Sequence, residues 1–272
     1  LVDAVNFLDD LRIGKDLKSI DQAATEDDPR TVADLLTEQV EFANVIVLNK
    51  TDLVNEDTLA TLEAYIDQLN PFALKLRASF GQIDSSKIMG TGRFDFEVAK
   101  QSKGWQLTLR DDGASEVEEY GVSSFVYRSR RPFHPQRFFD RLNQDWNGVL
   151  RSKGFFWLAS KIDKIGIWSQ AGRVARLDFG GFWWAAVPKE HWPDSEVFQS
   201  ELEKKWNSEV GDCRQELVFI GIGMDELAIY DSLQACLLTD EEMALGIQVW
   251  QQFQDPFPQW DVSVDEALAV RS

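Results

Sequence analysis

The sequence is poor in cysteine and in basic residues, and each shortage narrows the class of protein. Only two cysteines occur in 272 residues, Cys213 and Cys236, so there is no disulfide framework and no paired-cysteine metal motif. No run of 18 apolar residues indicates a membrane-spanning helix. Lys and Arg number 28 against 46 Asp and Glu, a net charge of −18. This charge argues against nucleic acid and anionic membranes as partners, and it is typical of a cytoplasmic protein.

Tryptophan is absent from the first 104 residues, and all ten tryptophans lie at or after Trp105. Between the two regions, residues 111–120 contain five acids and no base, which predicts a solvated linker. We therefore expect a boundary near residue 115. The predicted parts are a first domain over residues 1–114, a second over 115–258 and an acidic tail over 259–272.

The first region alternates helical and strand patterns. Apolar spacing predicts helices over residues 31–42 and 58–69. The short apolar run at 45–48 predicts a strand buried on both faces, and residues 72–77 predict another strand. Helix, strand, helix, strand in this order indicates a parallel α/β sheet.

The second region indicates an α+β domain with a mostly antiparallel sheet, because several neighbouring strands accompany few helices. Strands are predicted over residues 120–133, 154–160, 165–172, 174–187 and 214–223. Helices are predicted over 134–146, 224–238 and 239–250.

One motif carries recognisable chemistry. Asn49, Lys50 and Asp52 form an Asn-Lys-x-Asp pattern at the end of the buried strand 45–48. A carboxylate at Asp52 can accept hydrogen bonds from N1–H and the exocyclic amine of guanine, whereas adenine would leave it unpaired. Asn49 can bond the N7 edge and tie neighbouring loops together, and the stem of Lys50 can lie along the base plane. The carboxyl end of a parallel strand is where open α/β sheets bind ligands.

A longer resemblance surrounds this motif. The first region resembles the second half of a CobW-type GTPase, a branch of the P-loop GTPases, in the segments LVDAVNFL, EQVEFANVIVLNKTDLV, LNPFA and IMGTGRFDFE. The second region resembles the CobW C-terminal domain in YGVSSFVYRSRRPFHPQRF and GVLRSKGFFWLAS. The resemblance implies a partial P-loop GTPase sheet followed by an α+β C-terminal domain. It is strongest to members proposed as zinc chaperones.

The resemblance also implies site residues and partners. Asn49, Lys50 and Asp52 would read guanine, and Asn70 with Pro71 would sit in the loop that closes over the base. Asp3 would end the strand before the first helix. GTP, Mg²⁺ and Zn²⁺ are the implied ligands, and GTP binding and hydrolysis would be coupled to delivery of the metal to an unknown metalloprotein client.

Two family motifs do not occur in the sequence, the phosphate-binding loop Gly-x-x-x-x-Gly-Lys-Ser/Thr and the metal motif Cys-x-Cys-Cys. We therefore expect the sequence to be truncated at its N-terminus, with no catalytic residue of its own and no GTP hydrolysis by this segment alone. Two alternatives remain open. The chain could be a non-catalytic client-binding module with a vestigial nucleotide domain, or it could belong to a GTPase that inserts cobalt for cobalamin synthesis or nitrile hydratase.

Two features of the second region have competing interpretations. His134, in RRPFHP, is a candidate metal ligand, but a histidine before a proline at a helix start is more often a capping residue. No other metal ligand is identified. A cluster of four arginines could contact phosphates or a client, although ion pairs with nearby acids are the more common role: Arg128, Arg130, Arg131 and Arg137.

Overall fold

A computed structural model describes residues 1–13, 30–93, 120–264 and 266. Two β-sheets organise the described chain, one parallel and one antiparallel, which confirms the predicted fold class. The boundary expected near residue 115 lies outside the described residues. No helix in the described ranges is both long and apolar enough to cross a membrane.

The parallel sheet has three strands in the order β1-β2-β3: Val2–Asp3, Val45–Asn49 and Leu74–Arg77. Its helices are α1 (Phe7–Ile13), α2 (Val32–Glu41) and α3 (Glu56–Leu69). Thr31 caps the start of α2 with a capping box. The Asn55 side chain caps α3, which begins at Glu56, two residues before the predicted start. Strand β2 buries Ile46 and Leu48 fully, while its other face is only partly covered.

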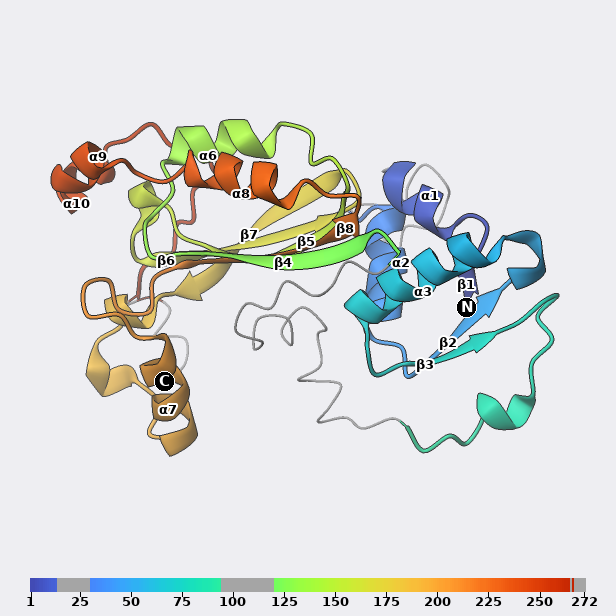
Figure 1. Ribbon diagram of the computed structural model, residues 1–272. Coiled ribbons are helices and arrows are strands. Elements are labelled where there is room, and N and C mark those ends of the chain that lie inside the picture. The colour runs from blue at the N-terminus through green and yellow to red at the C-terminus, as the bar shows by residue number, and fades with distance from the viewer. Residues whose placement is uncertain (14–29, 94–119, 265, 267–272) are drawn as a thin grey trace.

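The antiparallel sheet has five strands in the order β4-β8-β5-β6-β7. Their bounds are Val122–Ser129 (β4), Val149–Phe156 (β5), Lys164–Ala171 (β6), Val174–Phe182 (β7) and Gln215–Ile222 (β8). Helices α6 (Pro135–Leu142) and α8 (Glu226–Gln234) lie together on one face of this sheet (Figure 1). The strand predicted from residue 154 begins five residues earlier, at Val149.

Three further helices lie outside these layers. Helix α7 (Glu196–Lys205) hangs below the antiparallel sheet, away from α6 and α8 (Figure 1). The single helix predicted over 239–250 is wrong, because the chain forms α9 (Asp240–Ala244) and α10 (Ile247–Trp250). Gly246 lies between them with φ +78, a conformation that a continuous helix cannot contain.

Strand β8 is buried on both faces, and its alternating side chains enter two different cores. Leu217 and Phe219 pack in the core under α6 and α8, together with Trp168 of β6. Val218 and Ile220 point to the other face, where they join a core that also contains Leu62 of α3 and other side chains of the parallel unit. The two sheets are therefore parts of one packed molecule.

Polar contacts reinforce this packing at what we call the domain joint, formed by Leu11, Asp34, Glu41, Arg151, Gly172 and Arg176. Arg151 Nε donates to Glu41 Oε1 at 2.9 Å, and both side chains are at most 3% exposed. Arg176 pairs with Asp34, which is also the capping-box acid of α2. Gly172, in the β6–β7 turn, packs directly on the Leu11 carbonyl. Helices α1 and α2 are thus fixed against the second sheet.

Candidate functional site

The carboxyl ends of the three parallel strands meet at one edge of the sheet. Asp3 ends β1 opposite Asn49, which ends β2, and Leu48 pairs with Arg77 at the end of β3. The pairing continues past the strands, because Ala4 donates its N–H to the Asn49 carbonyl and Ala78 donates to the Leu48 carbonyl, at 3.0 and 2.8 Å. We call this place the nucleotide edge. It is where an open parallel sheet offers loops to a ligand.

Asn49 joins the loop after β2 to the loop after β3. Its Oδ1 accepts the Gly81 N–H at 2.9 Å. Thr51 adds a second tie, since its N–H and its hydroxyl both donate to the Ala78 carbonyl, at 3.2 and 3.1 Å. The tie between loops that the sequence predicts for Asn49 is present, and the Asn49 amide N–H groups donate to no described residue, so they can serve as donors to a ligand.

Lys50 is held by a carboxylate from β1. Its Nζ donates to Asp3 Oδ2 at 2.7 Å, although Lys50 itself takes a left-handed backbone conformation with φ +62. Partial burial acts to raise the pKa of Asp3, but hydrogen bonds from Lys50, Asn6 and Val5 outweigh it and lower the pKa below its usual value. Asp3 is therefore an anion at neutral pH.

Asp52 is exposed in a short 3₁₀ turn, Thr51–Leu53, and its carboxylate has no hydrogen bond or ion pair with any described residue. Nearby, the loop after β3 has two left-handed residues, Phe80 (φ +54) and Gly81 (φ +69). The backbone N–H groups of Ser79 and Phe80 find no acceptor within the described ranges. The nucleotide edge thus presents a free anion, a donor amide and free N–H groups, the set that a guanine edge requires.

Sequence reasoning missed the loop 78–81. This loop contributes backbone N–H groups, and backbone groups leave no motif in the amino-acid sequence. Its position directly after the predicted strand 72–77 was the available signal, because the loops after neighbouring parallel strands lie at the same edge.

Asn70 lies away from the nucleotide edge. It follows α3 and precedes β3, so it is placed at the amino edge of the sheet. Its buried Nδ2 donates to the carbonyls of Val40 and Ala43, both at 2.8 Å, which terminates α2. The structure does not bring Asn70 together with Asn49, Lys50 and Asp52. Its Nδ2 is used by the carbonyls at the end of α2, and its Oδ1 accepts the Phe72 N–H at 3.3 Å.

His134 begins helix α6. Its Nδ1 accepts the Arg137 N–H at 3.4 Å, its ring stacks on Phe253 at 4.9 Å, and Pro135 follows at the first helical position. Burial, and then the charge of Arg137, lower the pKa of His134. No group of three or more potential His, Cys, Asp or Glu metal ligands forms in the part of the chain that the structure describes. The geometry therefore gives His134 a capping role.

The arginine cluster forms internal contacts. Arg128 pairs with Glu216, Arg131 with Asp240, and Arg137 with Glu242. The Arg130 guanidinium donates to the carbonyls of Lys205, Gly211 and Cys213. These side chains hold the second domain together, as the ion-pair interpretation expects.

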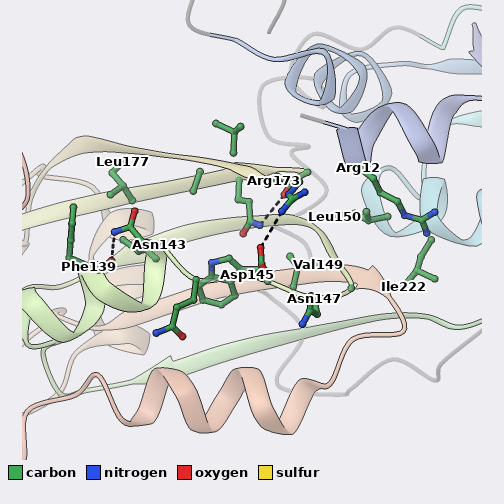
Figure 2. Close-up of a pocket in the computed structure, with 18 residues that line it drawn as sticks. Arg12, Phe139, Asn143, Asp145, Asn147, Val149, Leu150, Arg173, Leu177 and Ile222 are labelled. Carbon is green, nitrogen blue, oxygen red and sulfur yellow. Dashed lines mark hydrogen bonds and ion pairs between the residues drawn. The ribbon is translucent and has the colours of Figure 1, made fainter. Parts of the chain in front are cut away.

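A cavity of about 740 Å³ lies beside the β6–β7 turn and is the subject of Figure 2. Its lining includes Arg12 of α1 and Arg173, and Arg173 pairs with Asp145 at 3.3 Å. Asn143, also in the lining, donates to the Phe139 carbonyl. None of its lining residues comes from the nucleotide edge.

The cysteines offer no reactive centre. Both are free, and burial raises the pKa of Cys213 to about 12 and that of Cys236 to about 11. Neither thiol is a thiolate at neutral pH, the form that binds metal and acts as a nucleophile.

Comparison with known families matches both regions. Residues 1–76 match the CobW/HypB/UreG nucleotide-binding domain, and residues 122–237 match the cobalamin synthesis protein CobW C-terminal domain. A "Zinc-regulated GTPase metalloprotein activator 1" of Dictyostelium discoideum is 41% identical over 98% of this chain. A zinc chaperone of Mycobacterium tuberculosis is 30% identical over 86% of it. The chain spans about half the length of these curated relatives, 56% of each.

Among solved structures, the Zn(II)-bound YjiA GTPase of E. coli aligns with 87% of this chain and 59% of its own. Sequence identity is 18% and the TM-score is 0.33.

Proposed function

This chain belongs to the CobW family, whose nucleotide-binding and C-terminal domains it matches in order, and from this premise we propose that it recognises the guanine base in a GTP-dependent zinc chaperone. The observation that carries the proposal is the nucleotide edge. There the Asp52 carboxylate, unpaired among the described residues, lies beside the loop after β3, and Asn49 holds this loop by accepting the Gly81 N–H at 2.9 Å.

Base recognition follows from the donors and acceptors at this edge. Asp52 accepts from guanine N1–H and the exocyclic amine, and the Asn49 amide donates to N7. The free N–H groups of Ser79 and Phe80 are suited to the guanine O6 acceptor. Adenine carries an amine in place of O6 and has no N1–H, so it would leave both the carboxylate and the N–H groups unpaired, at a cost of roughly 1–3 kcal/mol for each buried polar group.

The proposal also concerns Mg²⁺, zinc and a client protein, and the support for each is different. The described residues do not fit Mg²⁺, because the sequence contains no phosphate-binding loop whose hydroxyl would hold it. Zinc is the proposed cargo, and two relatives are named for zinc. We propose a metalloprotein as the client that receives it. A cytoplasmic location suits the two free thiols.

The first experiment measures nucleotide selectivity by isothermal titration calorimetry on the complete protein. We expect GTP to bind at least tenfold more tightly than ATP. Asp52→Asn should weaken GTP strongly and favour xanthosine triphosphate, because xanthine carries an oxygen at C2 to which an amide can donate. Asp57→Asn, at an exposed acid in the first turn of α3, is the matched control and should bind like the wild type. Equal affinity of the wild type for GTP and ATP would refute the assignment of the nucleotide edge.

Zinc coupling needs its own measurement. Titration of the complete protein with Zn²⁺, in the GTP-bound and GDP-bound states, should give different affinities if the nucleotide controls the cargo. Identical zinc affinities in the two states would contradict the chaperone proposal and leave guanine recognition intact. A parallel titration with Co²⁺ tests the cobalt-insertion alternative.

A further inference from the structure

Asp3 collects three hydrogen-bond donors on one carboxylate. Oδ1 accepts the Val5 N–H at 3.0 Å. Oδ2 accepts the Asn6 side-chain amide at 3.0 Å and the Lys50 ammonium at 2.7 Å. The first two contacts are local and shape the turn into α1. The third spans 47 residues and reaches the motif that reads guanine.

The Lys50 side chain is consequently restrained at both ends. At its base, the backbone lies in the left-handed region at φ +62, a strained conformation for a residue with a Cβ. At its tip, Asp3 holds the ammonium. A free lysine side chain samples many rotamers, and a ligand that needs the lysine stem in one place must overcome that entropy on binding.

We propose that Asp3 is a positioning residue for base recognition: by holding the Lys50 ammonium, it fixes the lysine stem along the face of the guanine whose edge Asp52 reads. The inference rests on the proposed function, since it needs guanine at the nucleotide edge. Asp3 itself does not touch the base in this arrangement. It acts through Lys50, and the benefit is a stem that is ordered before the nucleotide arrives.

The two roles of Asp3 are separable by one substitution. Asp3→Asn keeps an Oδ1 acceptor for the Val5 N–H, and the exposed Asn6 amide can turn its own oxygen toward the new Nδ2 donor, so the turn into α1 is retained. The same change replaces the anionic oxygen with an amide that has no charge to hold Lys50. Asp9→Asn is the matched control, because Asp9 is an exposed α1 acid that pairs only with Arg12 among the described residues.

The test measures GTP and ATP affinity of the complete protein by calorimetry, together with urea unfolding of the nucleotide-free protein. We expect Asp3→Asn to weaken GTP by on the order of tenfold, equivalent to about 1.4 kcal/mol. ATP affinity should fall by a similar factor, because the lysine stem would lie along the face of either purine, while the preference for GTP set by Asp52 is retained. The unfolding midpoint should match that of Asp9→Asn, which should bind GTP like the wild type.

A double-mutant cycle with Lys50→Met decides whether Asp3 acts through Lys50. Methionine keeps an unbranched apolar stem but offers no charge, so adding Asp3→Asn to Lys50→Met should cause no further loss of GTP affinity. Additive losses would overturn the inference, as would an Asp3→Asn variant that binds GTP like the wild type. The proposed function fails by a different result, a wild type that does not distinguish GTP from ATP.

Discussion

At the scale of single residues, Glu242 shows how an ion pair makes the stability of the second domain depend on pH. Its carboxylate accepts two hydrogen bonds from the Arg137 guanidinium, at 2.8 and 2.6 Å, and one from the Thr239 N–H. Chiefly because of Arg137, the pKa of Glu242 falls to about 2 from 4.5. The contact connects α9 to α6.

A depressed carboxyl pKa stabilises the fold at pH values above the unfolded pKa, and the contribution is lost as pH falls through the folded pKa. The Glu242 contribution should therefore be complete above pH 4.5 and disappear toward pH 2. Glu242→Gln should lower the free energy of unfolding at pH 7 by on the order of 1 kcal/mol, since the pair is partly exposed. It should also flatten the decline at acid pH. Urea titrations at pH 7 and pH 3 check this, with the exposed neighbour Glu241→Gln as control. A Glu242→Gln variant with an unchanged acid decline would contradict it.

The residues of the nucleotide edge could be predicted only in part. Asn49, Lys50 and Asp52 were found because their spacing is local in the sequence. The partners Asp3 and Gly81 are 47 and 32 residues away from them, and only the order of the strands brings them close. Asn70 illustrates the reverse problem, because a polar residue before a proline marks a loop without saying at which edge of the sheet it lies.

At the scale of elements, strand β5 begins earlier than predicted, because the polar residues in its middle interrupt the apolar pattern. Arg151, Ser152 and Lys153 gave no apolar pattern, yet the first two are at most 3% exposed. Glu41 of α2 compensates Arg151, and Gln170 of β6 accepts from the Ser152 hydroxyl at 2.7 Å. A periodicity search cannot anticipate buried polar residues whose partners come from another element.

The turn between β6 and β7 gives an element-scale prediction. Gly172 has φ +57, and a Cβ there would lie 2.0 Å from the Leu11 carbonyl oxygen. Gly172→Ala should therefore incur both the left-handed strain, about 1–2 kcal/mol, and overpacking of about 1–3 kcal/mol. Gly223→Ala is the matched control, because Gly223 has φ +62 and open space around it. Equal losses of unfolding free energy in the two variants would show that the α1 contact is dispensable.

At the scale of the whole molecule, the sequence predicted two regions of different composition but not how closely they join. The tryptophan distribution and the acidic residues 111–120 suggested separate domains. In the described chain, β8 shares one face with α3 and the other with α6 and α8. The sequence predicts a strand over residues 214–223, but only the tertiary structure reveals which layer covers each face.

The buried Glu41–Arg151 pair makes the domain joint testable. Arg151→Met should destabilise the protein by up to about 3–5 kcal/mol, because it removes the hydrogen-bonded partner of a buried carboxylate and leaves only the longer pair with Lys153, at 3.8 Å. Adding Glu41→Leu should recover most of that loss. Lys204→Met removes an exposed pair with Glu201 and should cost at most about 1 kcal/mol. Chemical denaturation measures all three. If the double variant is no more stable than Arg151→Met alone, the cost does not come from an unpaired charge.

The uneven distribution of tryptophan along the chain also makes its fluorescence an intrinsic probe of one domain. The nine tryptophans that the structure describes all follow residue 119, and Trp146 and Trp168 lie against Phe219 in the core of the antiparallel domain. With Trp105 replaced by phenylalanine, tryptophan emission comes from that domain alone, because the nucleotide edge contains no tryptophan. A change in emission when guanine nucleotide binds then reports a signal that has crossed from one sheet to the other, with no dye attached.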